Sequence, residues 1–152
     1  MYSDHFRRLA HYDQWANERV LHSLARLETN APHAAVHLMG HLLVAADIWL
    51  RRIQGLPLDG VQVFPHATLE QCRHMYEETN PALLRFCDEL SDEQLDTVIT
   101  YKNVSGMVFT SSVADILTHI FNHATYHRAQ IATRLREGGF TPAITDFIAF
   151  TR

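Results

Sequence analysis

Four long stretches of this sequence carry apolar residues at every third or fourth position, which is the spacing of amphipathic helices. The stretches cover residues 2–27, 32–53, 69–90 and 112–136. Helices of this kind bury their apolar stripes against one another. The sequence therefore predicts an all-α fold, a four-helix bundle, and the interior of such bundles is a usual location for metal sites.

Short signals between these stretches refine the prediction. Three capping patterns predict helix starts, and they are Thr68 with Gln71, Ser91 with Gln94, and Ser112 with Asp115. Gly138-Gly139 predicts the end of the last helix, and Asn80-Pro81 predicts a kink or a break in the third. Residues 97–101 and 107–110 flank a turn, so we expect a small hairpin before the last helix, capping one end of the bundle. The tail, residues 140–152, is apolar enough to dock on the bundle.

Length and composition restrict the class of protein. A chain of 152 residues with 47% hydrophobic content predicts one domain over residues 1–152. The net charge of −4 and the lack of a basic block argue against nucleic acid as a partner. No apolar run of membrane-spanning length and no secretory signal is visible, so we expect a cytoplasmic protein without membrane contact. Cys72 and Cys87 lie roughly 22 Å apart along one predicted helix, which predicts two reduced thiols.

Histidine is the unusual residue, with eleven copies against a single lysine. His123 and His127 are four positions apart, which places both imidazoles on one side of a helix, about 40° apart around its axis. In the second helix His33, His37 and His41 recur at the same spacing, and helical projection places only His41 beside the apolar stripe. Projection also places His119 toward solvent, so His41, His123 and His127 form the most plausible set of ligands.

Three imidazoles leave coordination positions open, as catalytic zinc sites do, and imidazole also suits nickel, iron and copper. Spacing alone favours the alternative that these are solvated or hydrogen-bonded surface histidines. Asp13 and Asn17 are polar residues on the inward face of the first helix. A buried carboxylate needs a partner, such as an imidazole N–H, a metal ion or a hydroxyl, and an interhelical hydrogen bond or a solvated end of the bundle is the alternative.

Several segments resemble the DinB/YfiT superfamily, the DinB-like metalloenzymes, which are unrelated to the polymerase sharing the DinB name. The matching segments are YDQWANER at 12–19, HLLVAADIWL at 41–50, IFNHATYHRAQ at 120–130 and the ending 142–150 with TDF at 145–147. Each segment alone is modest, but their order and spacing are fairly specific.

The resemblance implies a bundle with up-down-down-up connectivity, frequently dimeric, that holds a divalent metal such as zinc, nickel or iron through three histidines. Matching position by position gives His41, His123 and His127, the same three residues that projection favours. Where this chain has Asp13, the family often has Asn. Members of the superfamily resemble S-transferases that use low-molecular-weight thiols, and an isomerase, while many have no known activity.

From this resemblance we expect a metal-dependent enzyme, a thiol-dependent S-transferase acting on small electrophiles, with a small-molecule substrate and a homodimeric assembly. A non-catalytic metal-binding bundle with a stress-response or sensor role, and a metal-dependent hydrolase, are the alternatives. Asp13, Asn17 and Tyr126 are expected to support the ligating histidines, which normally donate their second N–H to an acceptor. Arg128 is expected to form a structural salt bridge with Asp13, the alternative being a substrate carboxylate. The catalytic residues remain unassigned.

Overall fold

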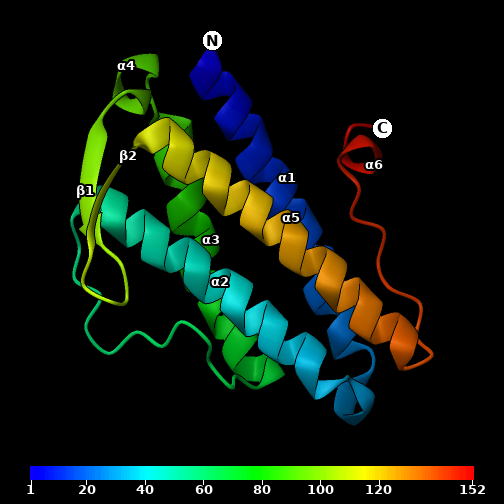
Figure 1. The fold of residues 1–152 in the computed structure, drawn as a ribbon. Helices are drawn as coiled ribbons and strands as arrows, with labels where there is room; N and C mark the ends of the chain where they lie inside the picture. The colour runs from blue at the N-terminus through cyan, green and yellow to red at the C-terminus, as the bar shows by residue number, and fades with distance from the viewer.

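Four long helices and one hairpin make up the fold, which confirms the all-α prediction (Figure 1). The computed structural model describes residues 1–152. The elements are α1 (Tyr2–Ala25), a 3₁₀ turn (Glu28–Asn30), α2 (His33–Gln54), α3 (Leu69–Glu89), α4 (Asp92–Leu95), β1 (Val98–Lys102), β2 (Val108–Ser112), α5 (Val113–Glu137) and α6 (Phe147–Phe150).

The long helices are connected up-down-down-up. Tyr76 donates a hydrogen bond to Glu18 at one end of the α1–α3 pair, and Arg7 donates to the carbonyl of Asp88 at the other, so these helices are antiparallel. α1 and α5 run in one direction, and α2 and α3 run in the other (Figure 1). Since α2 and α3 are parallel, the residues between them must return along the length of the bundle.

The core consists of two apolar clusters separated by buried polar side chains. One cluster contains Val20, Leu24, Met39, Leu42, Cys72, Ile131 and Leu135 among others, and the second contains Phe6, Leu50, Leu83, Cys87, Ile116 and Leu117 among others. Asp13 and Asn17 of α1 and Thr79 and Asn80 of α3 occupy sequence positions between the residues that enter the two clusters. Arg128 of α5 reaches the two α1 residues, so polar contacts link helices in the middle of the bundle.

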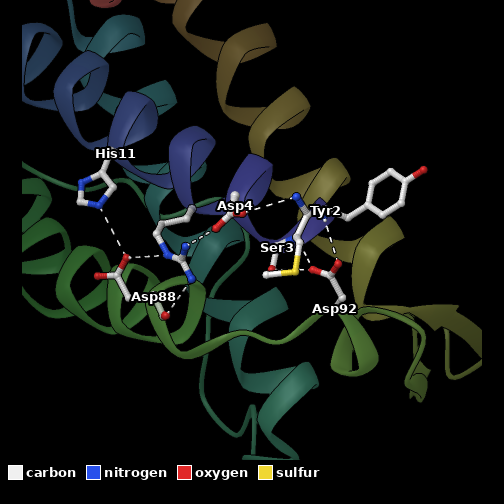
Figure 2. Close-up of polar contacts among 8 residues, drawn as sticks. Tyr2, Ser3, Asp4, His11, Asp88 and Asp92 are labelled. Carbon is white, nitrogen blue, oxygen red and sulfur yellow. Dashed lines mark hydrogen bonds and ion pairs between the residues drawn. The ribbon is translucent and has the colours of Figure 1, made fainter.

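Asp92 of α4 caps the start of α1. Its carboxylate accepts hydrogen bonds from the backbone N–H groups of Tyr2 and Ser3 and from the Ser3 hydroxyl (Figure 2). These bonds hold the pKa of Asp92 below its usual value, with the Ser3 side chain as the largest cause. Figure 2 also shows Asp88 of α3 beside His11, so the first turns of α1 are tied to both α3 and α4.

The predicted helix starts are present. Thr68 with Gln71 and Ser91 with Gln94 form complete capping boxes. Ser112 also caps its helix, since its hydroxyl accepts from the Asp115 N–H and in turn donates to the Asp115 carboxylate. The backbone of Ser112 pairs within the hairpin, opposite Val98.

The sequence predicted a kink or a break at Asn80-Pro81, and the break is wrong, because α3 is helical throughout with Pro81 in its interior. A proline there removes one helical hydrogen bond. Buried residues on both sides of it, Cys72 before and Leu83 and Cys87 after, anchor the helix in the two apolar clusters. Tertiary packing on both sides therefore outweighs the local preference.

The hairpin and the tail lie where the sequence placed them. The hairpin packs at the end of the bundle formed by the last turn of α2 and the first of α5, where the rings of Tyr101 and Trp49 meet at 5.0 Å between centroids. The tail crosses α1, with Tyr12 donating to the carbonyl of Thr145 at 2.7 Å and Arg19 donating to the carbonyl of Ile144 at 3.0 Å.

By length and composition, α2 is apolar enough to cross a membrane, with a mean hydropathy of 1.3 in its most apolar window. However, 61% of that window is buried inside the protein, as in the core helix of a soluble bundle. Its apolar surface is used by packing against α3 and α5.

Candidate metal centre

Three histidines from two helices converge on one point. His41 of α2 and His123 and His127 of α5 each present a ring nitrogen, and these three atoms lie within 4.8 Å of one another. The ring centroid of His41 is 5.0 Å from that of His123 and 4.6 Å from that of His127. The structure therefore brings together the three residues that the sequence singled out as ligands.

Hydrogen bonds fix the orientation of two of the rings. The Nδ1 of His41 lies 2.6 Å from the carbonyl oxygen of Val63, and the Nδ1 of His127 lies 2.7 Å from Oε1 of Gln130. An oxygen of this kind only accepts, so each Nδ1 donates a proton to it, and Nε2 is the ring nitrogen left to face a metal ion. The Nε2 of His127 is 3.1 Å from the Nε2 of His123, so these two nitrogens face each other across the site.

The surroundings favour neutral imidazoles. Burial, followed by repulsion from His127, His41 and His119, lowers the pKa of His123 to about 4. Burial also lowers the pKa of His127, and the hydrogen bond to Gln130 opposes that shift. A neutral imidazole is the form that donates a lone pair to a metal ion, so the lowered pKa values of His123 and His127 favour metal binding at neutral pH.

The connection between α2 and α3 forms one wall of this site. It supplies the Val63 carbonyl, and the ring of Phe64 stacks on the ring of His41 with 4.2 Å between centroids and an interplanar angle of 8°. A side chain at Gly40, the residue before His41, would lie 3.1 Å from the side chain of Ala67. The absence of a side chain at Gly40 therefore lets this connection approach α2 closely beside the histidine.

The other residues singled out from the sequence lie differently. Asp13 and Asn17 are buried but contact Arg128, which donates to Asp13 and to Asn17 Oδ1, and the Asn17 amide donates to Asp13 at 2.9 Å. The Asp13–Arg128 ion pair expected from the sequence is thus present. The ring of Tyr126 contacts the ring of His127 at 5.1 Å, and its side chain is largely exposed.

Sequence reasoning missed the groups that orient the histidines, which are Gln130, Val63 and Phe64. Gln130 follows His127 by three positions, and residues three apart on a helix are neighbours, so this signal was available. Val63 and Phe64 carry no such signal, because their position depends on the path of a connection between two distant helices.

The large cavities of the molecule lie elsewhere. A cavity of about 800 Å³ lies between α1, α5 and the tail, and its lining includes Tyr12, Thr125, Arg128 and Phe147. A second cavity, of about 810 Å³, lies between α1 and the tail. Neither is lined by His41, His123 or His127.

The donor set fits a divalent transition metal. Three imidazole nitrogens close together, with two of the rings held by hydrogen bonds on their other nitrogen, are the arrangement found around protein-bound zinc, nickel and iron. The fold and this centre together define a class of helical bundles in which facing helices can hold a metal ion through histidines.

The chain belongs to the DinB family, whose family model matches residues 1–152. It is similar to "Protein DinB" of Bacillus subtilis (strain 168), with 26% identity over 159 aligned residues, covering 95% of this chain and 92% of the relative. It is also similar to "Uncharacterized protein YizA" of the same organism, with 22% identity, covering 90% of this chain and 85% of the relative. The resemblance seen in the sequence is thereby confirmed at the level of the family.

Proposed function

We propose that this protein is a metal-dependent enzyme, a thiol-dependent S-transferase acting on small electrophiles. Its divalent ion is held by His41, His123 and His127. Membership of the DinB family and the convergence of these three residues support the proposal. The single observation that carries it is that one ring nitrogen from each of the three histidines lies within 4.8 Å of the other two.

Neutral ligands leave the charge of a bound ion uncompensated. A divalent ion there supplies a Lewis acid that favours the ionised, nucleophilic form of a thiol. The chain contributes orientation: Val63 and Gln130 hold the protons of His41 and His127 on Nδ1. Phe64 covers one face of the His41 ring and keeps water from it.

The first test is the metal content of the purified protein, measured by elemental analysis for wild type, His41→Ala and His127→Ala. His33→Ala is the matched control, because His33 is an exposed histidine on the same helix as His41. We expect about one divalent ion per chain in wild type and in the control, and loss of the ion in the other two variants.

The second test is transfer itself. The metal-loaded protein is assayed for consumption of 1-chloro-2,4-dinitrobenzene in the presence of glutathione, cysteine or another low-molecular-weight thiol. We expect a rate that depends on both thiol and metal and that is lost in His127→Ala. A protein that retains no stoichiometric metal, and whose thermal stability is the same with and without chelator, would refute the metal site and the enzyme together.

A non-catalytic metal-binding bundle is the second candidate, and one observation favours it. His41 and His127 are buried, and neither of the cavities near 800 Å³ is lined by the three histidines. In this alternative, metal raises the thermal stability of the protein, while no thiol binds to the metal-loaded form and no electrophile is consumed.

We also propose a cytoplasmic homodimer. Cys72 and Cys87 are buried, unpaired thiols, which suits a reducing compartment. The cavity between α1, α5 and the tail is lined in part by apolar side chains, among them the exposed Ile144, which a second copy would cover. Light scattering coupled to size-exclusion chromatography tests the assembly, and a mass of one chain at micromolar concentration would contradict it.

A further inference from the structure

Arg52, near the end of α2, is fixed between two aromatic rings. The guanidinium carbon lies 4.3 Å from the ring centroid of Trp49 and 4.9 Å from that of Tyr101. Its Nη2 donates to the carbonyl of Lys102 at 3.1 Å, which ties it to the hairpin. The rings and this bond hold a normally flexible side chain in one position.

The charge of Arg52 has no acidic partner. Its Nε is buried without a hydrogen bond, Nη1 makes none within the chain, and no carboxylate lies within ion-pair distance. The neighbouring Arg51 differs, since it pairs with Asp47 at 2.7 Å. Partial burial lowers the pKa of Arg52, and its charge faces two aromatic rings and a carbonyl but no carboxylate. A cation held in place without a carboxylate partner is available to an anionic ligand.

Arg52 lies on the same face of the bundle as the three histidines. It follows His41 by eleven positions, which is about three turns and only about 20° around the axis of α2. A series of adjacent rings connects the two places. The centroid of His123 is 5.4 Å from that of His119, which is 5.0 Å from that of Trp49, the ring beneath Arg52.

The guanidinium therefore lies roughly 10 to 15 Å from the three-histidine site, because helical side chains lean toward the N-terminus and Arg52 leans back over Trp49. A single ion or a very small ligand cannot contact both the guanidinium and the histidines across this distance, but an extended small molecule can. A guanidinium with a free Nη1 is suited to a carboxylate or another planar anion.

We infer that Arg52 is the anchor for the carboxylate of an extended low-molecular-weight thiol whose sulfur reaches the three-histidine site. This inference rests on the proposed function and specifies its thiol. The thiol lies along the α2–α5 face, over His119 and Trp49, with its carboxylate beside Nη1 of Arg52. Trp49 and Tyr101 position the guanidinium, and the histidines receive the sulfur end.

The experiment compares two probes that differ only in the terminal group, 8-mercaptooctanoate and 8-mercapto-1-octanol. Their binding to the zinc-loaded protein is measured by isothermal titration calorimetry. Wild type is compared with Arg52→Gln, with Arg52→Lys and with the matched control Arg51→Gln, after thermal unfolding has shown that each variant is folded. The alcohol serves as an internal control, because a variant that has only lost its hairpin packing should change the affinity for both probes by the same factor.

We expect wild type to bind the acid about ten-fold more tightly than the alcohol, as one charge-assisted hydrogen bond allows. This preference should disappear in Arg52→Gln, persist in part in Arg52→Lys and remain intact in Arg51→Gln. The assignment of Arg52 is overturned if wild type binds acid and alcohol equally, or if Arg52→Gln keeps the preference. If neither probe binds to the zinc-loaded wild type, the proposed thiol chemistry fails, and the assignment of Arg52 fails with it.

Discussion

Asp13 of α1 and Arg128 of α5, 115 positions apart in the sequence, form a buried ion pair with 2.5 Å between Oδ1 and Nη1. Their side chains are only 5% and 2% exposed. Burial raises the pKa of Asp13, and the charge and hydrogen bond of Arg128, together with the Asn17 amide, oppose this shift. Each residue thus depends on the other for its charge to be tolerated inside the bundle.

Removal of one partner should therefore cost more than removal of both. We expect Arg128→Met to lower the free energy of unfolding by about 3 to 5 kcal/mol, because Asp13 is left as an unpaired buried carboxylate. The double variant Asp13→Leu with Arg128→Met should recover most of that loss. Urea unfolding of wild type, the two single variants and the double variant measures the coupling. Additive losses would show that the two residues do not act as a pair.

Gln130 should affect metal affinity without contacting the ion. Its Oε1 accepts the Nδ1 proton of His127, so Gln130→Ala leaves that ring free to change orientation. We expect metal affinity to fall by about 10- to 100-fold, the usual cost of losing such a partner. Competition with a chromophoric chelator gives the affinity, and Gln54→Ala, at the exposed end of α2, is the control. If Gln130→Ala and Gln54→Ala bind the metal with equal affinity, Gln130 does not contribute to metal binding through His127.

Asp92 should stabilise the protein in a pH-dependent way. Its folded-state pKa lies below the usual 3.8, so its contribution is present above that value and is lost as the pH falls through the lowered pKa. We expect Asp92→Asn to melt at a lower temperature than wild type at about pH 7, and the difference to shrink below about pH 4. Glu93→Gln, which changes an adjacent exposed carboxylate, should show neither effect. A difference independent of pH would point to packing rather than to charge.

Pro81 should lower the stability of α3, and replacing it should raise the free energy of unfolding. It lies inside the helix and is exposed, so Pro81→Ala restores a hydrogen-bond donor without disturbing the core. We expect the free energy of unfolding to rise by about 1 to 3 kcal/mol, since proline is disfavoured by about 3 kcal/mol inside helices and its rigidity in the unfolded chain offsets part of this. Chemical denaturation measures the change against Arg85→Ala. A loss of stability would mean that Pro81 shapes the helix.

Local patterns in the sequence were sufficient for most of the fold. The helix starts at Leu69, Asp92 and Val113 follow the caps at Thr68, Ser91 and Ser112, because a cap is a contact between residues three positions apart. Pro81 is where local preference failed, because its cost is outweighed by packing from distant helices. The direction of each helical face was also readable, which is why His41 could be ranked above His33 and His37.

Contacts between segments that lie far apart in the sequence were harder to predict. The sequence identified Asp13 as inward-facing and favoured a salt bridge between Asp13 and Arg128. It also led us to expect that Asp13 supports the ligating histidines. The structure gives that support to Gln130 and Val63 instead. Arg52 carried no signal at all, because its surroundings combine α2 with the hairpin, and only the folded chain brings Tyr101 to it.

The connection between α2 and α3 is longer than the distance that it has to cover. Because the two helices are parallel, residues 55–68 must travel back along most of the bundle, and a helix as long as α3 spans about 30 Å. Fourteen residues reach at most about 50 Å when fully extended, and the path also curves around side chains. The chain is therefore not taut, and Val63 and Phe64 are held over His41 by their own contacts, the hydrogen bond to the Val63 carbonyl and the stacking of the Phe64 ring. A segment shortened by about three residues would still reach about 40 Å, so a deletion away from Val63 and Phe64 should leave both the helices and the wall of the site in place.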